Sequence, residues 1–304
     1  MPSQDGRTAV VTGVSVGGLG HWTALELARA GARVVLAGRT PAKLDATAAE
    51  IRAQVPGADL VPLTVDLMSL ASVRAAAEKA AALGPLDLLV NNAGIMATPY
   101  VRTADGFEQQ MATNHFGPFL LTGLLLPQLR QAGELRGDAR VVAVASQFHR
   151  VARRAPLDDP RRQERRYLKW FVYGETKLSN LLFTLELDRR LRAAGLPVSA
   201  TAAHPGFAAT HLTANGRFGG TQGVRAAVVE KAIRTVAQTA HAGALPTLMA
   251  ATADLAGGTY CGPSGPGEMR GLPQVVGTSA LARDEAAARR LWEISEQATG
   301  LRYP

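Results

Sequence analysis

The sequence predicts an α/β domain built on a doubly wound parallel sheet with helices on both faces. Short runs of β-branched and aliphatic residues alternate along the chain with longer segments rich in alanine and leucine at helical spacing. The short runs are apolar almost throughout, as expected of strands that are buried on both faces. Because right-handed crossovers join such strands, the helices between them fall on both sides of the sheet.

The elements follow from this periodicity, taken in chain order. Strands are expected at 8–12, 32–37, 59–65, 86–92, 139–146 and 197–203. Helices are expected at 19–30, 41–54, 69–82, 105–131 and 172–194. After His204 the pattern is less regular, with a helix expected from about residue 224 and a closing helix in the tail EAAARRLWEISEQATG. No repeat or linker divides the chain, so residues 1–304 are expected to form a single domain.

Composition excludes several classes of protein. Hydrophobic residues make up 47% of the 304 residues and charged residues 19%, which is typical of a globular chain rather than a disordered one. Cys261 is the only cysteine, so an intramolecular disulfide or a cysteine-cluster metal site is excluded. His115, His204 and His211 lie far apart in sequence, and no metal is expected. No export signal or membrane-spanning run is seen, which favours a cytoplasmic protein without a stable membrane anchor.

The chain is basic, with 33 Lys+Arg against 25 Asp+Glu and a net charge of +8. Much of the excess lies in the stretch HRVARRAPLDDPRRQERRYLKW, residues 149–170. The simplest interpretation is a solvated, arginine-rich surface segment; a site for anionic substrate groups or an acidic membrane is the alternative. No nucleic-acid motif or interleaving of aromatic residues accompanies it, so we expect no nucleic-acid partner.

A glycine-rich segment, TGVSVGGLG at 12–20, joins the first expected strand to the first helix. Such a turn lets backbone N–H groups approach a pyrophosphate at the positive end of a helix. Glycines in a βα loop are also compatible with an ordinary tight turn. The candidate cofactor-binding residues of this turn are Gly13, Ser15, Gly18, Leu19 and Gly20.

Four motifs occur in a fixed order: this glycine turn, NNAG at 91–94, Ser146 after the fifth expected strand, and YGETK at 173–177. Together they resemble the short-chain dehydrogenase/reductase family, whose members have one Rossmann-type domain. The segments ELARAGARVVLAGR, YGETKLSNLLFTLELDRRL, HPGFAAT and RRLWEISE resemble more narrowly its retinol-dehydrogenase-like branch. The likeness covers almost the whole chain. The turn before Gly18 is one residue longer than in the family pattern, which leaves open whether Gly17 or Gly18 faces the pyrophosphate and where Ser15 points.

The end of the second strand indicates which cofactor is bound. An acidic residue there would hydrogen-bond the ribose 2′-hydroxyl of NAD, but the segment LAGRTPAK offers Arg39, Thr40 and Lys43 instead. A guanidinium pairs well with a 2′-phosphate, so NADP(H) is favoured; Arg39 as a plain surface residue is the alternative. The resemblance implies further cofactor contacts from Asp66, Leu67, Asn91, Asn92, Ala93, Gly94, Pro205, Gly206 and Thr210.

Tyr173 and Lys177 are four residues apart on an expected helix and therefore share one face. A free tyrosine has a pKa near ~10. A lysine ammonium about 4 Å away is expected to lower this pKa toward the range useful for acid–base catalysis. The resemblance implies that Ser146 binds the substrate carbonyl oxygen and that Tyr173 gives it a proton. It also implies that Lys177 and Tyr173 contact the cofactor, and that Asn114 positions a water that relays protons to Lys177.

The expected substrate side lies in two loops, at about 147–171 and 207–240. Their candidate apolar residues are Phe148, Trp170, Phe171, Phe207, Leu212 and Phe218. The leading interpretation is an NADP(H)-dependent carbonyl reductase or alcohol dehydrogenase for a bulky, mostly apolar substrate. The alternative is a non-catalytic NADP(H)-binding sensor or scaffold on the same fold. Family members often dimerise through the helix that carries Tyr173, so a homodimer stays open.

Overall fold

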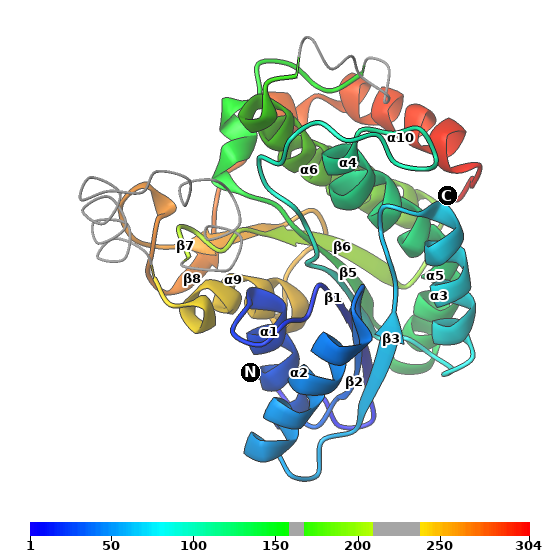
Figure 1. The fold of residues 1–304 in the computed structure, drawn as a ribbon, viewed down its shortest axis with the longest axis vertical. Coiled ribbons are helices and arrows are strands. Elements are labelled where there is room, and N and C mark those ends of the chain that lie inside the picture. The colour runs from blue at the N-terminus through cyan, green and yellow to red at the C-terminus, as the bar shows by residue number, and fades with distance from the viewer. Residues whose placement is uncertain (158–166, 209–237) are drawn as a thin grey trace.

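A single eight-stranded sheet forms the centre of the molecule in a computed structural model that describes residues 1–157, 167–208 and 238–304 (Figure 1). Its strand order is β3-β2-β1-β4-β5-β6-β7-β8. All neighbouring strands are parallel except β7 and β8, which form an antiparallel pair at one edge. The strands are β1 (Thr8–Thr12), β2 (Arg33–Gly38), β3 (Leu60–Thr64), β4 (Leu88–Asn91), β5 (Ala139–Val144), β6 (Val198–Ala203), β7 (Tyr260–Pro263) and β8 (Pro273–Val275).

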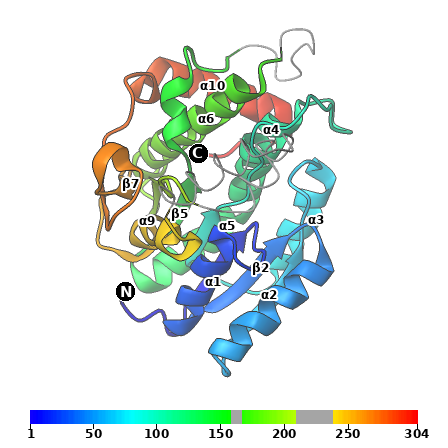
Figure 2. The ribbon, with the colours of Figure 1, turned by 60° about the vertical axis from the view of Figure 1, so that its left-hand side comes forward.

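Helices cover both faces of this sheet. The longer ones are α1 (Leu19–Arg29), α2 (Pro41–Gln54), α3 (Leu70–Ala81), α5 (Gly117–Arg136), α6 (Lys169–Ala193), α9 (Ala240–Thr252) and α10 (Glu285–Thr299). Short helical turns are α4 (Gln109–Met111), η1 (Ala112–Phe116), η2 (Gln147–Val151), η4 (Pro266–Glu268) and η5 (Leu281–Arg283). Helices α1, α2 and α9 share one apolar cluster with the sheet and lie together on one face (Figure 2). Helices α3, α5 and α6 share the other cluster on the opposite face.

The sheet places the functional site because its strand order reverses between β1 and β4. In a doubly wound sheet, ligands bind at the carboxyl ends of the strands, where the crossovers diverge to opposite faces. Both β4 and β5 are buried along their whole length, which explains their uninterrupted apolar sequences. The loops that follow these two strands therefore lie at the reversal point.

Helix α10 packs outside α5 and α6 rather than on the sheet (Figure 1). The Trp292 ring lies 5.0 Å from Phe119 of α5 and 5.9 Å from Phe183 of α6, measured between ring centroids. The Tyr303 hydroxyl donates to the Phe119 carbonyl at 3.0 Å. The tail therefore covers part of the outer face of the helix that carries Tyr173. In the described parts of the chain, no helix has the length and apolar character needed to span a bilayer.

The predicted fold class is confirmed, and strand β1 and helix α2 have the predicted bounds. The helix predicted at 105–131 begins only at Gln109 and contains a π-helical turn at η1. Strands β7 and β8 were not predicted, because YCGP and PQV are short and contain proline. The helix predicted from residue 224 lies outside the described residues. Proline also occurs in the other edge strand, at the exposed Pro62 of β3.

Candidate active site

Ser146, Tyr173 and Lys177 meet where β5 ends. Ser146 follows β5 by two residues and caps η2, its hydroxyl accepting a hydrogen bond from the Phe148 N–H at 3.2 Å. Tyr173 and Lys177 lie one turn apart on α6 and are 8% and 5% exposed. The Lys177 Nζ donates to the Val144 carbonyl at the end of β5, 2.8 Å away. The residues predicted to be catalytic therefore form one cluster, in which the half-buried Ser146 side chain is hydrogen-bonded to that of the buried Tyr173.

The pKa shifts in this cluster come mainly from burial. Burial raises the pKa of Tyr173 to about 12, and the hydrogen bond with Ser146 opposes this rise. Burial also lowers the pKa of Lys177 to about 8. The expectation that Lys177 lowers the pKa of Tyr173 is therefore wrong for this arrangement, because desolvation of the phenolate dominates. A phenol with this pKa is protonated at neutral pH, which suits a proton donor.

Asn114 lies beside this cluster on the π-helical turn η1. Its side chain accepts from the Ile95 N–H at 2.8 Å and donates to the Ile95 carbonyl and to the Thr176 hydroxyl, both at 2.9 Å. A Cβ built on Gly94 would lie 3.2 Å from the Asn114 Oδ1 and 3.5 Å from the Lys177 Nζ. The loop after β4, the turn η1 and helix α6 thus meet at Asn114. Single π-helical turns of this kind often occur at functional sites.

The lengthened glycine turn is held by hydrogen bonds among its own residues and with the start of α1. Gly17 has a positive φ of 77°, and its N–H donates to the Nδ1 of His21 at 3.2 Å. The Gly18 N–H donates to the Ser15 carbonyl at 2.9 Å, and Gly18 is the N-cap of α1. The first-turn N–H groups of α1, starting at Leu19, have no partner within the helix and are the ones that can meet an anion. The hydrogen bond between His21 and the turn was not predicted from the sequence.

The turn is packed tightly against the loop after β4. A Cβ on Gly13, whose φ is 74°, would lie 2.7 Å from the Ala93 Cα, and one on Gly20 would lie 2.6 Å from the Asn92 Nδ2. Asn92 Nδ2 in turn donates to the Thr12 carbonyl at 2.7 Å. Four residues predicted to bind the cofactor are therefore brought together: Gly13, Gly20, Asn92 and Ala93. By contrast, a Cβ on Gly18 would meet only the Ser15 carbonyl, at 3.1 Å.

The other residues predicted to contact the cofactor lie at or after the ends of β2, β3, β4 and β6. Arg39 and Lys43 are exposed at the start of α2, and their side chains have no acidic partner among the described residues. Asp66 accepts from the Met68 N–H at 3.0 Å, and Leu67 is buried. The Asn91 side chain instead points to α5, donating to the Thr122 hydroxyl at 3.0 Å.

After β6, the Pro205–Gly206 segment lies at the same end of the sheet. Gly206 has a φ of 63°, and a Cβ there would lie 2.5 Å from the Met269 carbonyl. The Pro205 carbonyl accepts from the Gln238 Nε2 at 2.6 Å. Thr210 lies outside the described residues. The glycine-rich turn and the first-turn N–H groups of α1 fit the pyrophosphate of a dinucleotide.

Aromatic rings lie together among the residues predicted to contact the substrate. The Phe148 ring is stacked on Trp170, with centroids 5.5 Å apart, and meets Tyr173 edge-on at 5.6 Å. The Arg153 guanidinium lies 5.2 Å from the centre of the Phe171 ring. Phe148 therefore adjoins both Tyr173 and Trp170. Leu212 and Phe218 lie outside the described residues.

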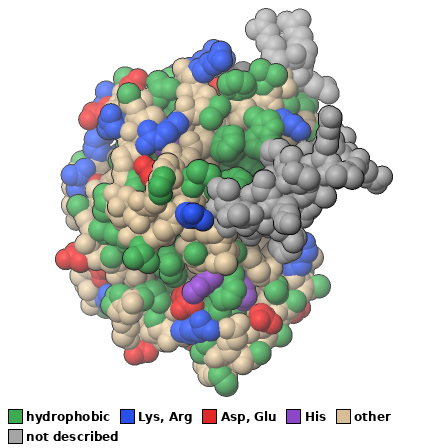
Figure 3. All heavy atoms as spheres, turned by 90° about the vertical axis from the view of Figure 1, so that its left-hand side faces the viewer, with side chains coloured by type: hydrophobic (Ala, Val, Ile, Leu, Met, Phe, Trp, Pro, Cys, Tyr) green, Lys and Arg blue, Asp and Glu red, His purple; other side chains and the backbone are tan. Residues whose placement is uncertain are grey.

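The arginine-rich stretch is only partly described. Arg150 donates to the Gln147 side chain at 2.9 Å and to the Gly277 carbonyl at 2.6 Å, so it acts as a structural link. On the face that carries the β7–β8 hairpin, Lys and Arg side chains are scattered among hydrophobic ones rather than gathered in a stripe (Figure 3). In the described parts of the chain, no three His, Cys, Asp or Glu side chains are grouped to hold a metal ion.

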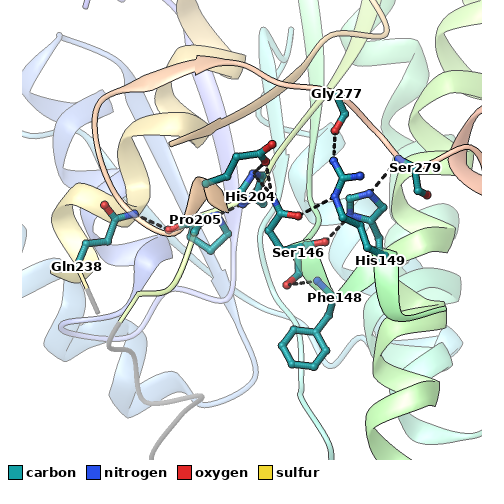
Figure 4. A network of polar contacts seen from close by, with 12 residues as sticks. Ser146, Phe148, His149, His204, Pro205, Gln238, Gly277 and Ser279 are labelled. Carbon is teal, nitrogen blue, oxygen red and sulfur yellow. Dashed lines mark hydrogen bonds and ion pairs between the residues drawn. The ribbon is translucent and has the colours of Figure 1, made fainter. Parts of the chain in front are cut away.

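A polar network next to Ser146, shown in Figure 4, was not predicted from the sequence. It joins Gln147 of η2 to Glu268 of η4, and Glu268 in turn to His204 after β6. His149 of η2 has other partners. His149 donates from Nδ1 to the Ser146 carbonyl at 2.7 Å, since its Nε2 accepts from the Ser279 N–H at 3.2 Å. The HPG segment was the only sequence signal near this network. Its partner Glu268 could not be linked to it from the sequence, because more than sixty residues separate them.

The family model for short chain dehydrogenases matches residues 7–155. Human retinol dehydrogenase 13 is 37% identical over 305 residues, covering 98% of this chain and 86% of that protein. The chain belongs to the short-chain dehydrogenase/reductase family, and to its retinol-dehydrogenase-like branch. It is accordingly an oxidoreductase that acts on alcohol or carbonyl groups with a nicotinamide cofactor.

Two other relatives support this placement. Polyprenol dehydrogenase from Mus musculus is 44% identical over 213 residues, covering 70% of this chain and 63% of that protein. A solved structure of an uncharacterized protein from Mycobacterium paratuberculosis is 41% identical, with a TM-score of 0.81. The similarity to that structure covers 100% of this chain and 97% of that chain. The family likeness therefore extends through the segments that follow the catalytic helix.

Proposed function

We propose that the protein is an NADP(H)-dependent carbonyl reductase or alcohol dehydrogenase whose substrate is bulky and mostly apolar. The observation that carries the proposal is the cluster of Ser146 with the buried Tyr173 and Lys177 at the end of β5. The loop after β4 packs between this cluster and the glycine-rich turn. The exposed Arg39 and Lys43 at the start of α2 favour NADP(H), because both are positioned where a 2′-phosphate would need cationic partners.

In the proposed reaction, the glycine-rich turn and the N-terminus of α1 would hold the cofactor's pyrophosphate, and its reduced nicotinamide would supply the hydride for the carbonyl carbon. The Ser146 hydroxyl donates a hydrogen bond to the carbonyl oxygen and fixes its position. The Tyr173 hydroxyl gives that oxygen a proton, so the carbonyl becomes an alcohol. Lys177 restores the proton of Tyr173, and its lowered pKa, about 8, allows it to release one near neutral pH. Asn114 holds the loop that faces Lys177.

The substrate class is proposed from the aromatic residues at the site. Phe148 and Trp170 offer an apolar face next to the Tyr173 hydroxyl. Two relatives are named for retinol and polyprenol, both apolar alcohols, which supports a substrate of this character without specifying it. We also propose that the protein acts in the cytoplasm.

Titration of the purified protein with NADPH and with NADH, followed by cofactor fluorescence, tests the proposal. We expect NADPH to bind at least about tenfold more tightly than NADH, because an Arg–phosphate pair contributes over 1 kcal/mol. A panel of apolar ketones and aldehydes then tests turnover, with Tyr173→Phe as the control. Equal binding of both cofactors would contradict the NADP(H) assignment. Tight binding without turnover of any carbonyl compound would favour the sensor or scaffold alternative.

A further inference from the structure

The Glu268 carboxylate joins two segments of the active site that are far apart in sequence. It lies on η4, between β7 and β8, and its Oε2 is 2.9 Å from the Nε2 of His204, which follows β6. The same oxygen accepts a hydrogen bond from the Gln147 side chain, directly after Ser146. One side chain thus connects the serine end of β5 with the Pro205–Gly206 segment after β6.

The hydrogen-bond partners fix the tautomer of His204 and the orientation of the Gln147 amide. The Gly206 N–H can only donate, so the His204 Nδ1, 3.2 Å away, accepts and the proton resides on Nε2. Gln147 presents its oxygen to Arg150, at 2.9 Å, and therefore its NH₂ group to Glu268. Two N–H donors then converge on one carboxylate oxygen, which explains why the His204 Nε2 and Gln147 Nε2 lie 3.3 Å apart.

His204 has no room to adopt another orientation. Its side chain is 0% exposed, and a Cβ built on Gly262 would collide with its Nε2. The Tyr260 ring packs on it with centroids 5.2 Å apart. Burial lowers the pKa of His204 to about 4, which keeps the ring neutral at pH 7 and leaves Nδ1 able to accept from Gly206.

The backbone at Glu268 is strained to deliver this carboxylate. Its φ is 54°, in the left-handed region that glycine adopts readily and other residues occupy at a cost of about 1–3 kcal/mol. A glycine would remove that cost but would also remove the two hydrogen bonds to Oε2. Strained residues of this kind persist when the surroundings hold them, and they are concentrated at functional sites.

We propose that Glu268 is a positioning residue, which acts through His204 to hold the Pro205–Gly206 segment against the cofactor and through Gln147 to hold Ser146. The carboxylate keeps the proton of His204 on Nε2. The unprotonated Nδ1 can then accept the hydrogen bond from the Gly206 N–H and hold that residue in place. This inference rests on the proposed function for the identity of the ligand that the segment contacts. It adds a residue from η4, to which neither the motifs nor the family likeness assigned a role.

Glu268→Gly separates positioning from stability, because it relieves the backbone cost while removing the carboxylate. We expect Tm to stay the same or rise. We expect the Kd for NADPH to increase and kcat to fall by about tenfold or more, since small misplacements at a reacting centre have effects of this size. Glu268→Gln keeps an acceptor oxygen for both donors and should restore both values to within about threefold. Glu26→Ala is the matched control, because Glu26 is similarly exposed and also contacts a histidine Nε2, that of His241.

A double-mutant cycle with His204→Asn tests the route of the effect. The amide oxygen that this substitution introduces can still accept from the Gly206 N–H, but the shorter side chain cannot reach Glu268. Glu268→Gly should therefore change the NADPH Kd by less than about twofold in this background. Additive losses of affinity in the double variant would overturn the inference, as would an unchanged Kd and kcat in Glu268→Gly alone.

Hydrogen exchange of the protein without cofactor gives a readout that does not depend on the proposed function. We expect amides of the segment around Gly206 to exchange faster in Glu268→Gly and at the wild-type rate in Glu268→Gln. Unchanged exchange in Glu268→Gly would overturn the positioning role. A wild-type protein that binds neither NADPH nor NADH would overturn the proposed function instead, and the exchange result would still decide whether Glu268 holds this segment.

Discussion

The Lys177 Nζ lies 5.8 Å from the centre of the Tyr173 ring, but its hydrogen bond goes to the carbonyl that ends β5. The ammonium is therefore placed by the sheet rather than by the tyrosine. Because it is only 5% exposed, its charge is held in the protein interior at the expense of folding stability. Catalytic sites commonly carry such a cost.

Lys177→Met should therefore raise stability at pH 7 while it abolishes turnover. The lowered pKa, about 8 against the ordinary 10.5, corresponds to at most about 3 kcal/mol of lost stability below pH 8. Between pH 8 and 10.5 the unfolded chain binds more protons, so the free energy of unfolding of the wild type rises with pH. The Val144 carbonyl keeps a partner in the variant, because Asn180 also donates to it at 3.1 Å.

Urea denaturation at several pH values measures this difference. The stability gained in Lys177→Met should be largest at pH 7 to 8 and should shrink as the pH approaches 10. A variant that is less stable than the wild type at pH 7 would show that the hydrogen bond to Val144 outweighs the buried charge.

Tyr173→Phe should lower kcat by about 10²–10⁴-fold, the range typical for loss of a general acid. The ring remains to pack against Phe148, so the Kd for NADPH should change by less than about threefold. Stopped-flow turnover and cofactor fluorescence measure the two effects separately. If binding and turnover fall together, Tyr173 is needed for the cofactor cleft itself rather than for proton transfer alone.

Buried neutral histidines should make the protein sensitive to acid. Burial lowers the pKa of His115 to about 3 and that of His149 to about 4. Between pH 6.5 and these values the unfolded chain binds more protons, so stability falls as the pH falls. In the wild type the His115 Nε2 lies 2.7 Å from the Ser295 hydroxyl, and His115→Gln keeps this hydrogen bond. Between pH 7 and 5 the free energy of unfolding should fall by about 2 kcal/mol less in the variant than in the wild type. Equal losses in the two proteins would contradict the burial argument.

Two glycines of the turn should respond differently to alanine. Gly20→Ala places a Cβ 2.6 Å from the Asn92 Nδ2 and 2.7 Å from the Gly13 carbonyl, so we expect a loss of stability of about 1–3 kcal/mol. Gly18→Ala has an ordinary φ of −83° and one close contact, 3.1 Å from its Cβ to the Ser15 carbonyl, so a small shift of the turn should accommodate it at a smaller loss of stability. Weaker NADPH binding by a fully folded Gly18→Ala would place the cofactor at Gly18. Unchanged binding would show that the ligand meets the turn elsewhere.

Arg39→Ala should weaken NADPH binding by about tenfold or more and leave NADH binding nearly unchanged, because only the former carries the 2′-phosphate. Lys43→Ala serves as the comparison for a second exposed cation on the first turn of α2. Fluorescence titration at two salt concentrations checks the electrostatic origin of the effect, which should be smaller at high salt. Equal weakening of both cofactors would assign Arg39 to another part of the dinucleotide.

The sequence predicts the fold well where patterns are local. Long apolar runs identify β1 to β6, and the four-residue spacing of Tyr173 and Lys177 is enough to place both on one face of α6. The hairpin of β7 and β8 is different, since strands this short carry little periodicity. Glu268 could not be predicted because its role depends on a left-handed backbone and on partners contributed by η2 and β6. The pKa of Tyr173 depends on burial, which no spacing reveals.

The prolines of the edge strands have a consequence for how the molecule behaves at high concentration. Pro62 is exposed in β3, and Pro273 begins β8, so each edge of the sheet lacks a backbone donor within a strand of three to five residues. An edge of this kind is a poor template for a strand from a second molecule. Partly opened molecules should therefore tend to refold rather than join into extended β-aggregates.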